Sequence, residues 1–312
     1  MKSRSGLCIF LLVFLLPNLA FGETIYVDGT YTGIISDGTR ERPYRTINGG
    51  IQNAESGDTI KVLPGVYEEK VVVDDNLTLS GMGPDTTVIK GLAGTAVTIR
   101  KNYNVTLEKF TVCNSEGHGI DLEYCTSNVS IVVRNVISAA NLDNGFNQKN
   151  GCKAMVELSN CTFVRNSQHG AQSMGNSGFI NCIATNNNGN GFSSYGGGGF
   201  SGSFSNSWNN HGQNFAYLAV TNSLEVDPQY VDEDTGDLRL RSGSPCRNKG
   251  STDAASRNPD GSRNDMGAYG GPGSAGFYNG YGSGPVVTDL LVTPASVPLG
   301  ATFTIRATGK AQ

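Results

Sequence analysis

Five copies of one short motif, a His or Asn followed by Gly, lie between Gly117 and Phe215: His118-Gly119, Asn144-Gly145, His169-Gly170, Asn190-Gly191 and His211-Gly212. Successive copies are 26, 25, 21 and 21 residues apart. A fixed period in the low twenties is typical of repeat proteins, in which each unit buries its apolar face only by stacking on its neighbours. The stretch therefore predicts a solenoid.

Each repeat contains three short strands. Small or apolar residues stand nine positions before each glycine, at Phe110, Val136, Cys161, Cys182 and Ser203, and an asparagine precedes three of them, at Asn135, Asn160 and Asn181. Short alternating runs such as Val105-Thr106-Leu107 lie further upstream. Strands of this length, separated by Asn and Gly where the backbone enters the left-handed region, predict an all-β fold built of three-strand coils. Because parallel crossovers are almost always right-handed, we expect a right-handed parallel β-helix.

These repeats, the asparagine column at the bend between the second and third strands, and the strand Gly119-Ile120-Asp121-Leu122-Glu123 resemble the pectin-lyase-like superfamily. The resemblance covers roughly residues 24 to 270 and implies a fold rather than one activity, since lyases, hydrolases, esterases, epimerases and adhesins share it. It also implies that substrate lies along the outer face of the first strand of each coil.

The ends of the chain predict secretion and further segments. Lys2 and Arg4 precede an apolar run from Leu7 to Leu16, and Ala20-Phe21-Gly22 follows, as in a secretory signal peptide. We expect a secreted, extracellular or cell-surface product without a membrane span, because no later segment approaches about 20 apolar residues. The predicted segments are a signal peptide (1–22), an N-terminal cap and first coil with a short helix at Gly50 to Ala54 (23–75), coils (76–225), a C-terminal capping segment (226–270), a flexible Gly-rich linker (271–284) and the start of an immunoglobulin-like domain (285–312).

Charge and cysteine content narrow the partners. Without Lys2 and Arg4 the basic count falls from 23 to 21 against 27 acidic residues, which gives a net charge of −6. An acidic chain argues against nucleic acid as a partner. We expect a monomer. Cys125 and Cys152 follow equivalent strands of adjacent coils and are the candidate disulfide. Cys161 and Cys182 share one inward position, which we interpret as a stack of buried thiols.

Charged outward positions occur on two coils. Asp121 and Glu123 point from the same face about 7 Å apart, with Lys149 about one coil from Glu123. They are the candidate catalytic residues, either as the acid and base of a hydrolase or as carboxylates for Ca²⁺ beside a lysine base in a lyase. No cofactor is certain, and no other metal site is predicted. The alternative is a cross-strand ion pair between Glu123 and Lys149 on a solvated sheet.

The later coils have no Asp, Glu, Lys or Arg between Arg165 and Glu225. Amides beside exposed aromatic rings suit neutral sugars, which stack on the rings and hydrogen-bond to the amides. Two outward columns are expected: Asp121, Asn147, Gln172, Ser193, Asn214, and Glu123, Lys149, Met174, Tyr195, Ala216. The candidate substrate-binding residues are His118, Asn147, Gln172, Tyr195 and Asn214.

Gly117-His118-Gly119 resembles a motif of polygalacturonases with this fold, in which the His supports aspartates on preceding coils. The corresponding earlier coil reads Gly94-Thr95-Ala96-Val97 and has no aspartate. Because His alternates with Asn down the repeats, we interpret the three histidines as turn formers with positive φ.

The prediction is a secreted β-helix that associates with polysaccharide and, if active, cleaves it as a lyase or glycoside hydrolase. One alternative is a non-catalytic surface or structural module. Another is an adhesin-type protein that binds another protein, which would expose an apolar patch on the outward columns.

Overall fold

The computed structural model describes residues 22–195, 199–278, 286–291 and 306–310. The predicted signal peptide, apart from Gly22, lies outside them. So do residues 285, 292–305 and 311–312 of the segment expected to begin an immunoglobulin-like domain.

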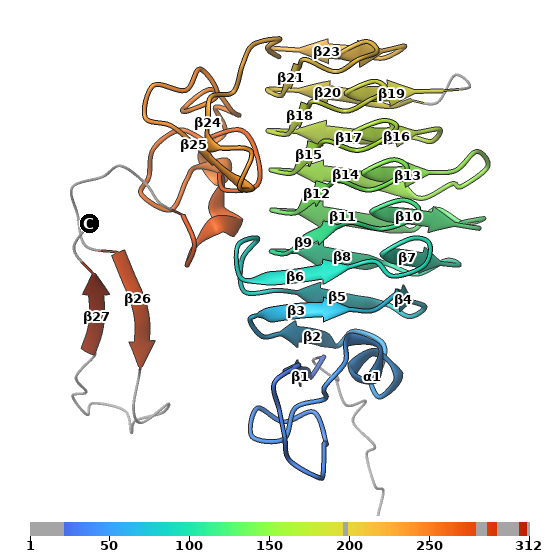
Figure 1. Cartoon of the computed structure of the whole chain (residues 1–312), viewed down its shortest axis with the longest axis vertical. Coiled ribbons are helices and arrows are strands. Elements are labelled where there is room, and N and C mark those ends of the chain that lie inside the picture. Colours follow the sequence, from blue (N-terminus) through green and yellow to red (C-terminus); the bar gives the residue numbers. More distant parts are fainter. Residues whose placement is uncertain (1–21, 196–198, 279–285, 292–305, 311–312) are drawn as a thin grey trace, which may run out of the picture.

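Three parallel sheets form a parallel β-helix, as predicted (Figure 1). Sheet A contains β1 (Thr24–Val27), β2 (Thr59–Val62), β5 (Leu77–Ser80), β8 (Val105–Glu108), β11 (Ser130–Arg134), β14 (Met155–Ser159), β17 (Ser177–Ile180), β20 (Ser201–Ser203) and β23 (Ala219–Thr221). Sheet B contains β3 (Gly65–Glu68), β6 (Thr87–Lys90), β9 (Thr111–Cys113), β12 (Ile137–Ala139), β15 (Thr162–Val164), β18 (Ile183–Thr185) and β21 (Asn206–Trp208). Sheet C contains β4 (Val71–Val73), β7 (Val97–Arg100), β10 (Ile120–Glu123), β13 (Phe146–Gln148), β16 (Ala171–Ser173), β19 (Phe192–Ser194) and β22 (Phe215–Ala216).

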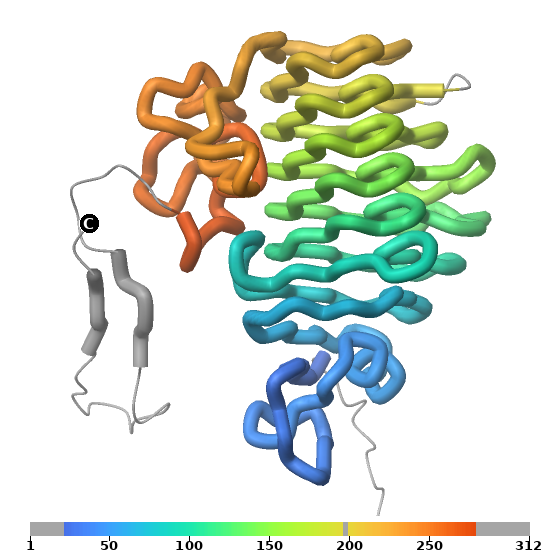
Figure 2. The backbone as a smooth tube through the Cα atoms, in the orientation of Figure 1, coloured from blue at the N-terminus to red at the C-terminus, as the bar shows by residue number. Residues whose placement is uncertain are grey.

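Each coil passes through the three sheets in the order A, B, C, and Figure 2 shows the coils stacked along one axis. Alternate side chains of every strand point inward. Aliphatic side chains fill the core of the N-terminal coils, and phenylalanine rings fill that of the C-terminal coils. Phe179 and Phe192 stack with centroids 4.0 Å apart, and Phe215 lies 5.8 Å from Phe192. Cys161 and Cys182 are buried on adjacent coils, and the Cys161 N–H donates to Cys182 Sγ (3.5 Å), which agrees with the shared inward position predicted for them.

The bend between sheets A and B needs left-handed backbone. Asn135, Asn160 and Asn181 have φ of 53°, 48° and 56°, as the asparagine column predicts. Asn tolerates this region because its short polar side chain costs less there than a bulky one. In the next coil Phe204 takes this place with φ of 46°.

The His/Asn-Gly motif has a different role from the predicted one, because none of its described residues has positive φ. The glycines are required by close approach instead. A Cβ at Gly145 would lie 2.6 Å from the carbonyl oxygen of Gly170, and one at Gly170 would lie 2.6 Å from that of Gly191. Glycine therefore allows successive coils to approach each other at this corner.

The His and Asn side chains of the motif form a ladder of hydrogen-bond acceptors. His118 Nδ1 accepts from the Asn144 backbone N–H (3.2 Å), and Asn144 Oδ1 accepts from the N–H of His169 (2.9 Å). His169 Nδ1 accepts from Asn190 (2.8 Å), and Asn190 Oδ1 from Gln213 (2.8 Å). His and Asn alternate because each can place an acceptor atom at this position.

The last coil is two residues longer than predicted. Phe192 pairs with Phe215 and Ser193 with Ala216, so Asn214 occupies the position of Gly191 rather than that of Ser193. Likewise Ser205, not Ser203, follows Cys182 in the inward column, and its hydroxyl accepts from the Cys182 N–H. The fifth motif, His211-Gly212, is therefore out of register with the other four.

The N-terminal helix α1 (Ile47–Gln52) begins three residues before the predicted one. Thr46 is its N-cap and accepts a hydrogen bond from the Gly49 N–H. Ile47 and Ile51 are buried in the main core. Figure 1 places α1 beside the first strands, at the N-terminal end of the solenoid.

The predicted C-terminal capping segment lies beside sheet B, not over the last coil (Figure 1). It includes β24 (Tyr230–Asp232), β25 (Asp237–Leu240) and η1 (Ala254–Ser256), and η2 (Pro272–Ser274) follows in the predicted linker. Its apolar residues pack on outward residues of sheet B, and the joint cluster contains Ile137, Val164, Ile183, Tyr230, Leu238, Leu240, Cys246, Met266, Ala268 and Tyr269. Residues 271–278 of the predicted flexible linker are folded as well, and Tyr278 is buried.

The bend asparagines anchor this segment. Asn135 Nδ2 donates to the carbonyls of Ala268 and Gly270 (2.9 and 2.8 Å), and Asn160 Nδ2 donates to that of Asp265 (2.9 Å). Asn181 Oδ1 accepts from the Ser251 N–H (2.7 Å). The same residues that make the bends therefore fix where the C-terminal segment packs.

Three further observations concern the C-terminal strands, the predicted disulfide and the lengths of the described helices. The strands β26 (Val286–Leu291) and β27 (Arg306–Lys310) form an antiparallel pair, and an immunoglobulin-like domain stays a prediction. Cys125 and Cys152 are free thiols that contact each other, and this contact raises the pKa of Cys125 and lowers that of Cys152. A covalent bond between them stays a prediction. No described helix is long and apolar enough to span a membrane.

Candidate functional site

The structure brings the three predicted catalytic residues together on the outer face of sheet C. Asp121 and Glu123 lie on β10, and Lys149 directly follows β13 on the next coil. Lys149 Nζ lies 2.8 Å from Asp121 Oδ2 and 3.3 Å from Glu123 Oε1. Asn147 Nδ2 donates to Asp121 Oδ1 (2.7 Å), and Arg100 Nε lies 3.5 Å from Glu123 Oε2.

This cluster is neutral overall, since two carboxylates face two cations. The Asp121 side chain is only 3% exposed, whereas that of Lys149 is 47% exposed. Partial burial lowers the pKa of Lys149, but hydrogen bonds and charge from Asp121 and Glu123 outweigh burial and raise that pKa. A lysine held as a cation suits ion pairing better than proton abstraction.

In the part of the chain that the structure describes, the side chains around Asp121 and Glu123 do not form a set of metal ligands. Among the described residues, no group of three or more His, Cys, Asp or Glu side chains is placed to hold a metal ion. The side-chain contacts form an ion-pair network, which Arg100 and Asn147 extend across three coils.

The predicted substrate-binding residues differ in accessibility. Asn147 is 5% exposed and joins the Asp121 network. His118 Nδ1 serves the acceptor ladder, and Asn214 Nδ2 donates to Glu225 Oε2 (2.9 Å). Gln172 is half-buried and accepts from Asn144 Nδ2 (3.1 Å), while Tyr195 is 59% exposed. Of the five, Tyr195 is the most exposed.

Two further tyrosines, outside the predicted substrate-binding set, lie at the same edge. Tyr124 follows β10 and Tyr217 follows β22, and they are 80% and 76% exposed. The strands of sheet C are parallel, so Tyr124, Tyr195 and Tyr217 all stand at its carboxyl edge, which we term the tyrosine edge. The three tyrosines follow their strands at different register positions: Tyr195 is level with Glu123, Tyr124 lies one residue beyond that level, and Tyr217 is level with Ser194. A single column of the repeat therefore does not reveal them as a set.

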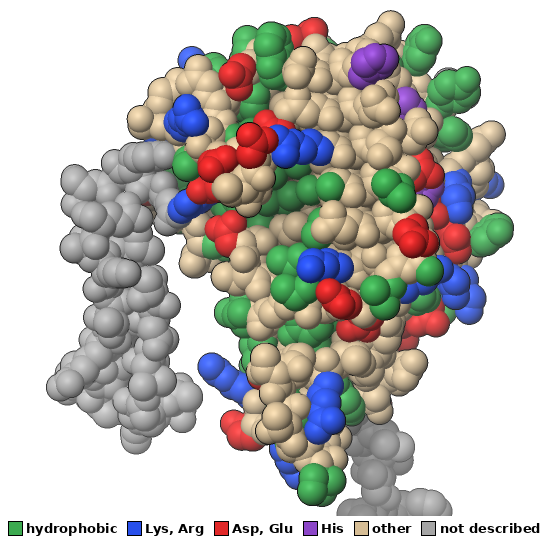
Figure 3. Space-filling model, in the orientation of Figure 1, with side chains coloured by type: hydrophobic (Ala, Val, Ile, Leu, Met, Phe, Trp, Pro, Cys, Tyr) green, Lys and Arg blue, Asp and Glu red, His purple; other side chains and the backbone are tan. Residues whose placement is uncertain are grey.

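Charge is distributed unevenly over the solenoid. Figure 3 shows basic and acidic side chains gathered over the coils of β7, β10 and β13, whereas uncharged polar atoms and histidine cover the later coils of sheet C. This agrees with the uncharged stretch between Arg165 and Glu225.

A second concave region, absent from the predictions, lies between sheet B and the C-terminal segment. This cleft has a volume of about 740 Å³. Its floor consists of outward residues of sheet B, including Val88, Ile137, Ala139 and Val164, and the turn between β24 and β25 roofs it. Apolar side chains are visible within the hollow in Figure 3, with charged ones at its rim.

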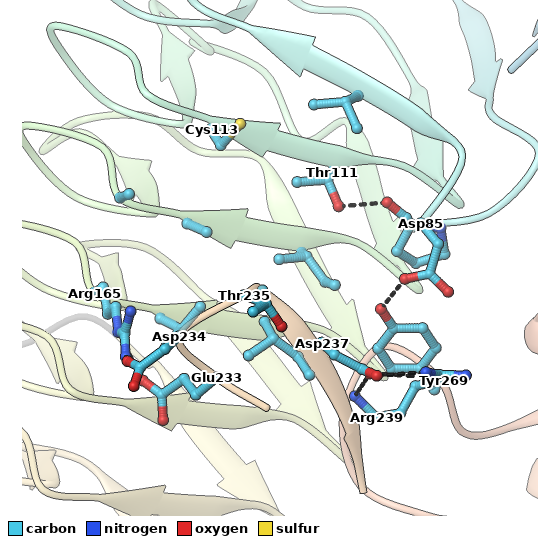
Figure 4. A pocket seen from close by; sticks show the side chains of 18 of the residues that line it. Asp85, Thr111, Cys113, Arg165, Glu233, Asp234, Thr235, Asp237, Arg239 and Tyr269 are labelled. Atoms are coloured by element: carbon cyan, nitrogen blue, oxygen red, sulfur yellow. Dashed lines mark hydrogen bonds and ion pairs between the residues drawn. The ribbon is translucent and has the colours of Figure 1, made fainter. Parts of the chain in front are cut away.

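Contacts between the solenoid and the C-terminal segment bound the cleft at both ends (Figure 4). At one end Arg165 Nε lies 2.9 Å from Glu233 Oε1, and its NH2 group lies 2.6 Å from Asp234 Oδ1. At the other end the Tyr269 hydroxyl donates to Asp85 Oδ1. Burial and the Asp85 charge raise the pKa of Tyr269, so its hydroxyl remains a neutral donor.

Asp237 and Arg239 form a side-by-side ion pair next to Tyr269 (Figure 4). Arg239 Nε lies 2.7 Å from Asp237 Oδ1, and a second contact joins NH2 to Oδ2. The hydrogen bonds from Arg239 lower the pKa of Asp237, so this carboxylate is ionised at neutral pH. The pair presents a fixed polar surface at this end of the cleft.

No protein-family model matches the chain, and no curated protein matches it. Solved structures with similarity to it include pectate lyase Pel9A (12% identity, TM-score 0.34, covering 81% of this chain and 97% of that one). A rhamnogalacturonan lyase has 14% identity and a TM-score of 0.39, covering 61% and 70%. The pectin methylesterase from Aspergillus niger has 16% identity and a TM-score of 0.32, covering 74% and 73%. The strand pairing itself establishes the β-helix, and similarity at this level carries no argument about activity.

Proposed function

We propose that this chain is a secreted β-helix that binds polysaccharide along the tyrosine edge of sheet C. The observation that carries the proposal is the exposure of three rings at this edge, those of Tyr124, Tyr195 and Tyr217, with the half-buried amide of Gln172 on the face beside them. Sugar rings stack on aromatic faces and exchange hydrogen bonds with amides. The uncharged later coils favour a neutral stretch of glycan over a highly charged one.

Cleavage is a second candidate, favoured by the closeness of Lys149 to Asp121 and Glu123. Two features oppose it. Asp121 is almost completely buried, and both acids are neutralised by neighbouring cations. We therefore place recognition before catalysis.

A glycan array probed with residues 23–312, with and without Ca²⁺, tests the proposal. We expect binding that is lost when Tyr124, Tyr195 and Tyr217 are all changed to Ala, because the variant lacks the aromatic faces on which the sugar rings would stack. Trp208→Ala is the matched control, since Trp208 is 39% exposed but belongs to sheet B. A blank array, or equal binding by the triple variant, would reject the proposal.

Product analysis on each bound polysaccharide separates the two candidates. Binding without new reducing or unsaturated ends supports recognition. New ends that disappear in Asp121→Asn and Lys149→Met would establish an enzyme on the charged coils instead.

A further inference from the structure

We infer that the cleft between sheet B and the β24–β25 hairpin is a second glycan site that binds one or two amino sugar units. The inference rests on the proposed function only in taking carbohydrate as the ligand class. It concerns a different face of the solenoid, and nothing in the tyrosine edge is required for it.

Size and shape are the first argument. A volume of about 740 Å³ lies within the range of about 300–1,000 Å³ typical of small-molecule sites. Both ends are bounded by contacts across the cleft, Arg165 with Glu233 and Asp234, and Tyr269 with Asp85. A short saccharide or a chain end fits such a space, whereas a polymer passing through it would meet these contacts.

The apolar floor is the second argument. Val88, Ile137 and Val164 present aliphatic side chains to the cleft, and the Tyr269 ring stands at one end (Figure 4). A pyranose ring has a C–H face that packs on such surfaces while its hydroxyls point to the polar rim. Thr111 and Thr235 are among the rim residues that carry hydroxyl groups.

Charge selects the kind of sugar. The lining contains four carboxylates and two guanidinium groups, a net charge of −2 from Asp85, Glu233, Asp234, Asp237, Arg165 and Arg239. Both arginines are already paired with acids. Asp85 is exposed and receives one hydrogen bond, from Tyr269, on Oδ1. A protonated amine on the ring would therefore be attracted, and a uronate would be repelled.

Figure 4 shows how a ligand amine would be received. Asp85 lies at the hydroxyl end of Tyr269, and the Asp237 carboxylate is held by Arg239 (Figure 4). An ammonium group next to Asp85 Oδ2, the oxygen that Tyr269 does not contact, would form a charge-assisted hydrogen bond, which is about twice as strong as a neutral one. Acetylation of that amine removes its charge and two donors, so the site distinguishes a free amine from an acetamide.

The test is titration calorimetry of residues 23–312 with the β-1,4-linked disaccharide of glucosamine, its N,N′-diacetyl form and cellobiose. We expect the glucosamine disaccharide to bind at least about tenfold more tightly than either neutral sugar, which corresponds to about 1.4 kcal/mol. Its affinity should fall with added salt. Equal affinity for the three sugars, or no binding of the glucosamine form, would overturn the inference.

Variants locate the binding. Asp85→Asn keeps the size of the side chain and an acceptor for Tyr269 but should weaken binding of the glucosamine disaccharide about tenfold. Ala139→Phe fills the floor and should abolish binding without changing charge. Glu157→Gln removes an exposed acid from sheet A and should have no effect. Binding that survives Ala139→Phe would place the ligand elsewhere and reject the cleft.

Failure of this inference is distinguishable from failure of the proposed function. The triple tyrosine variant should still bind the glucosamine disaccharide, and Ala139→Phe should still bind the array polysaccharide. Loss of disaccharide binding in the triple variant would assign it to the tyrosine edge and overturn the cleft site.

Discussion

Sheets B and C repeat with the same period, yet the C-terminal segment covers the outer face of sheet B and not that of sheet C (Figure 1). Sheet C carries polar outward side chains such as Asp121, Asn147 and Gln172, and the C-terminal segment does not pack on it (Figure 1), although Asp121 and Asn147 are buried by their own neighbours. Sheet B carries Ile137, Val164 and Ile183 outward, and the C-terminal segment packs over them. The comparison shows that the outward residues of each sheet, not the coil itself, decide whether a face becomes a surface or an interface.

The two faces also satisfy their polar groups differently. On sheet C the charges neutralise one another within the face. On sheet B the bend asparagines bind the backbone of a segment distant in sequence. Substitutions that remove the asparagine contacts beside sheet B should therefore detach the C-terminal segment. Substitutions in the charged network of sheet C should lower stability only locally.

The largest effect is expected from Asn160→Ala, which breaks the cover of sheet B. Asn160 Nδ2 contacts Asn264 Oδ1, the Asp265 carbonyl and the Gly267 carbonyl. Leaving buried acceptors unpaired costs about 1–3 kcal/mol, and Ala in the left-handed region adds about 1–2 kcal/mol. Equilibrium denaturation should show a loss of about 3 kcal/mol.

Asn160→Gly is the matched control, because glycine accepts the φ of 48° but lacks the amide. It should lose about 2 kcal/mol. A loss below about 0.5 kcal/mol in both variants would show that these hydrogen bonds do not hold the C-terminal segment.

A smaller effect is expected from Lys149→Ala, which breaks the network of sheet C. The variant leaves the buried Asp121 carboxylate with Asn147 as its remaining side-chain partner. Because Lys149 is itself half exposed, we expect a loss of about 1–2 kcal/mol rather than the 3–5 kcal/mol typical of a fully buried pair.

A double-mutant cycle with Asp121→Asn sharpens this measurement, since the double variant should recover part of the loss. Lys153→Ala removes an exposed lysine from the same loop and should be neutral. Additive losses in the cycle would mean that Asp121 and Lys149 do not interact energetically.

The contribution of the acceptor ladder to stability should depend on the presence of an acceptor atom at each position and not on the imidazole ring. His169→Ala leaves the Asn190 N–H without its acceptor and should cost about 1 kcal/mol. His169→Asn supplies the acceptor used on the neighbouring coils and should cost less than about 0.5 kcal/mol. Chemical denaturation at pH 7.5 measures both, and equal losses would show that the ladder depends on the imidazole.

The smallest effect is a pH dependence of stability. Burial lowers the pKa of His169, against a raising effect of Asp143, so the folded state binds this proton less readily than the unfolded state. The unfolding free energy should therefore fall as the pH drops through about 6.5, the ordinary value for histidine. The difference between the wild type and His169→Asn isolates this contribution, and parallel curves from pH 7.5 to 5 would refute it.

The coil architecture could be predicted because every coil repeats the same local requirements. The asparagines at 135, 160 and 181 mark a left-handed bend, and the alternating strands mark an inward face. The extra two residues of the last coil could not be placed, because Phe204 stands where the pattern has asparagine. That shift displaced the expected positions of Ser203 and Asn214 by two residues.

The acid and base cluster was predicted from strand alternation, but its burial was not. Asp121 is covered by side chains of the neighbouring coil, which a column of outward residues does not reveal. The cleft was not predictable in the same way. Its walls come from Asp85 to Arg165 and from Glu233 to Tyr269, and their proximity depends on where the C-terminal segment packs.

The anchors of that segment also restrict how the protein can change in length. Repeat proteins commonly gain or lose whole units, because each unit contacts only its neighbours. Here Asn135, Asn160 and Asn181 lie on three successive coils, and each meets its own part of residues 251–270. A coil inserted or deleted within this span would place a different bend opposite each of these contact residues. The contacts of the C-terminal segment therefore fix the number of coils between Asn135 and Asn181. Duplication of coils is compatible with the fold only outside that span.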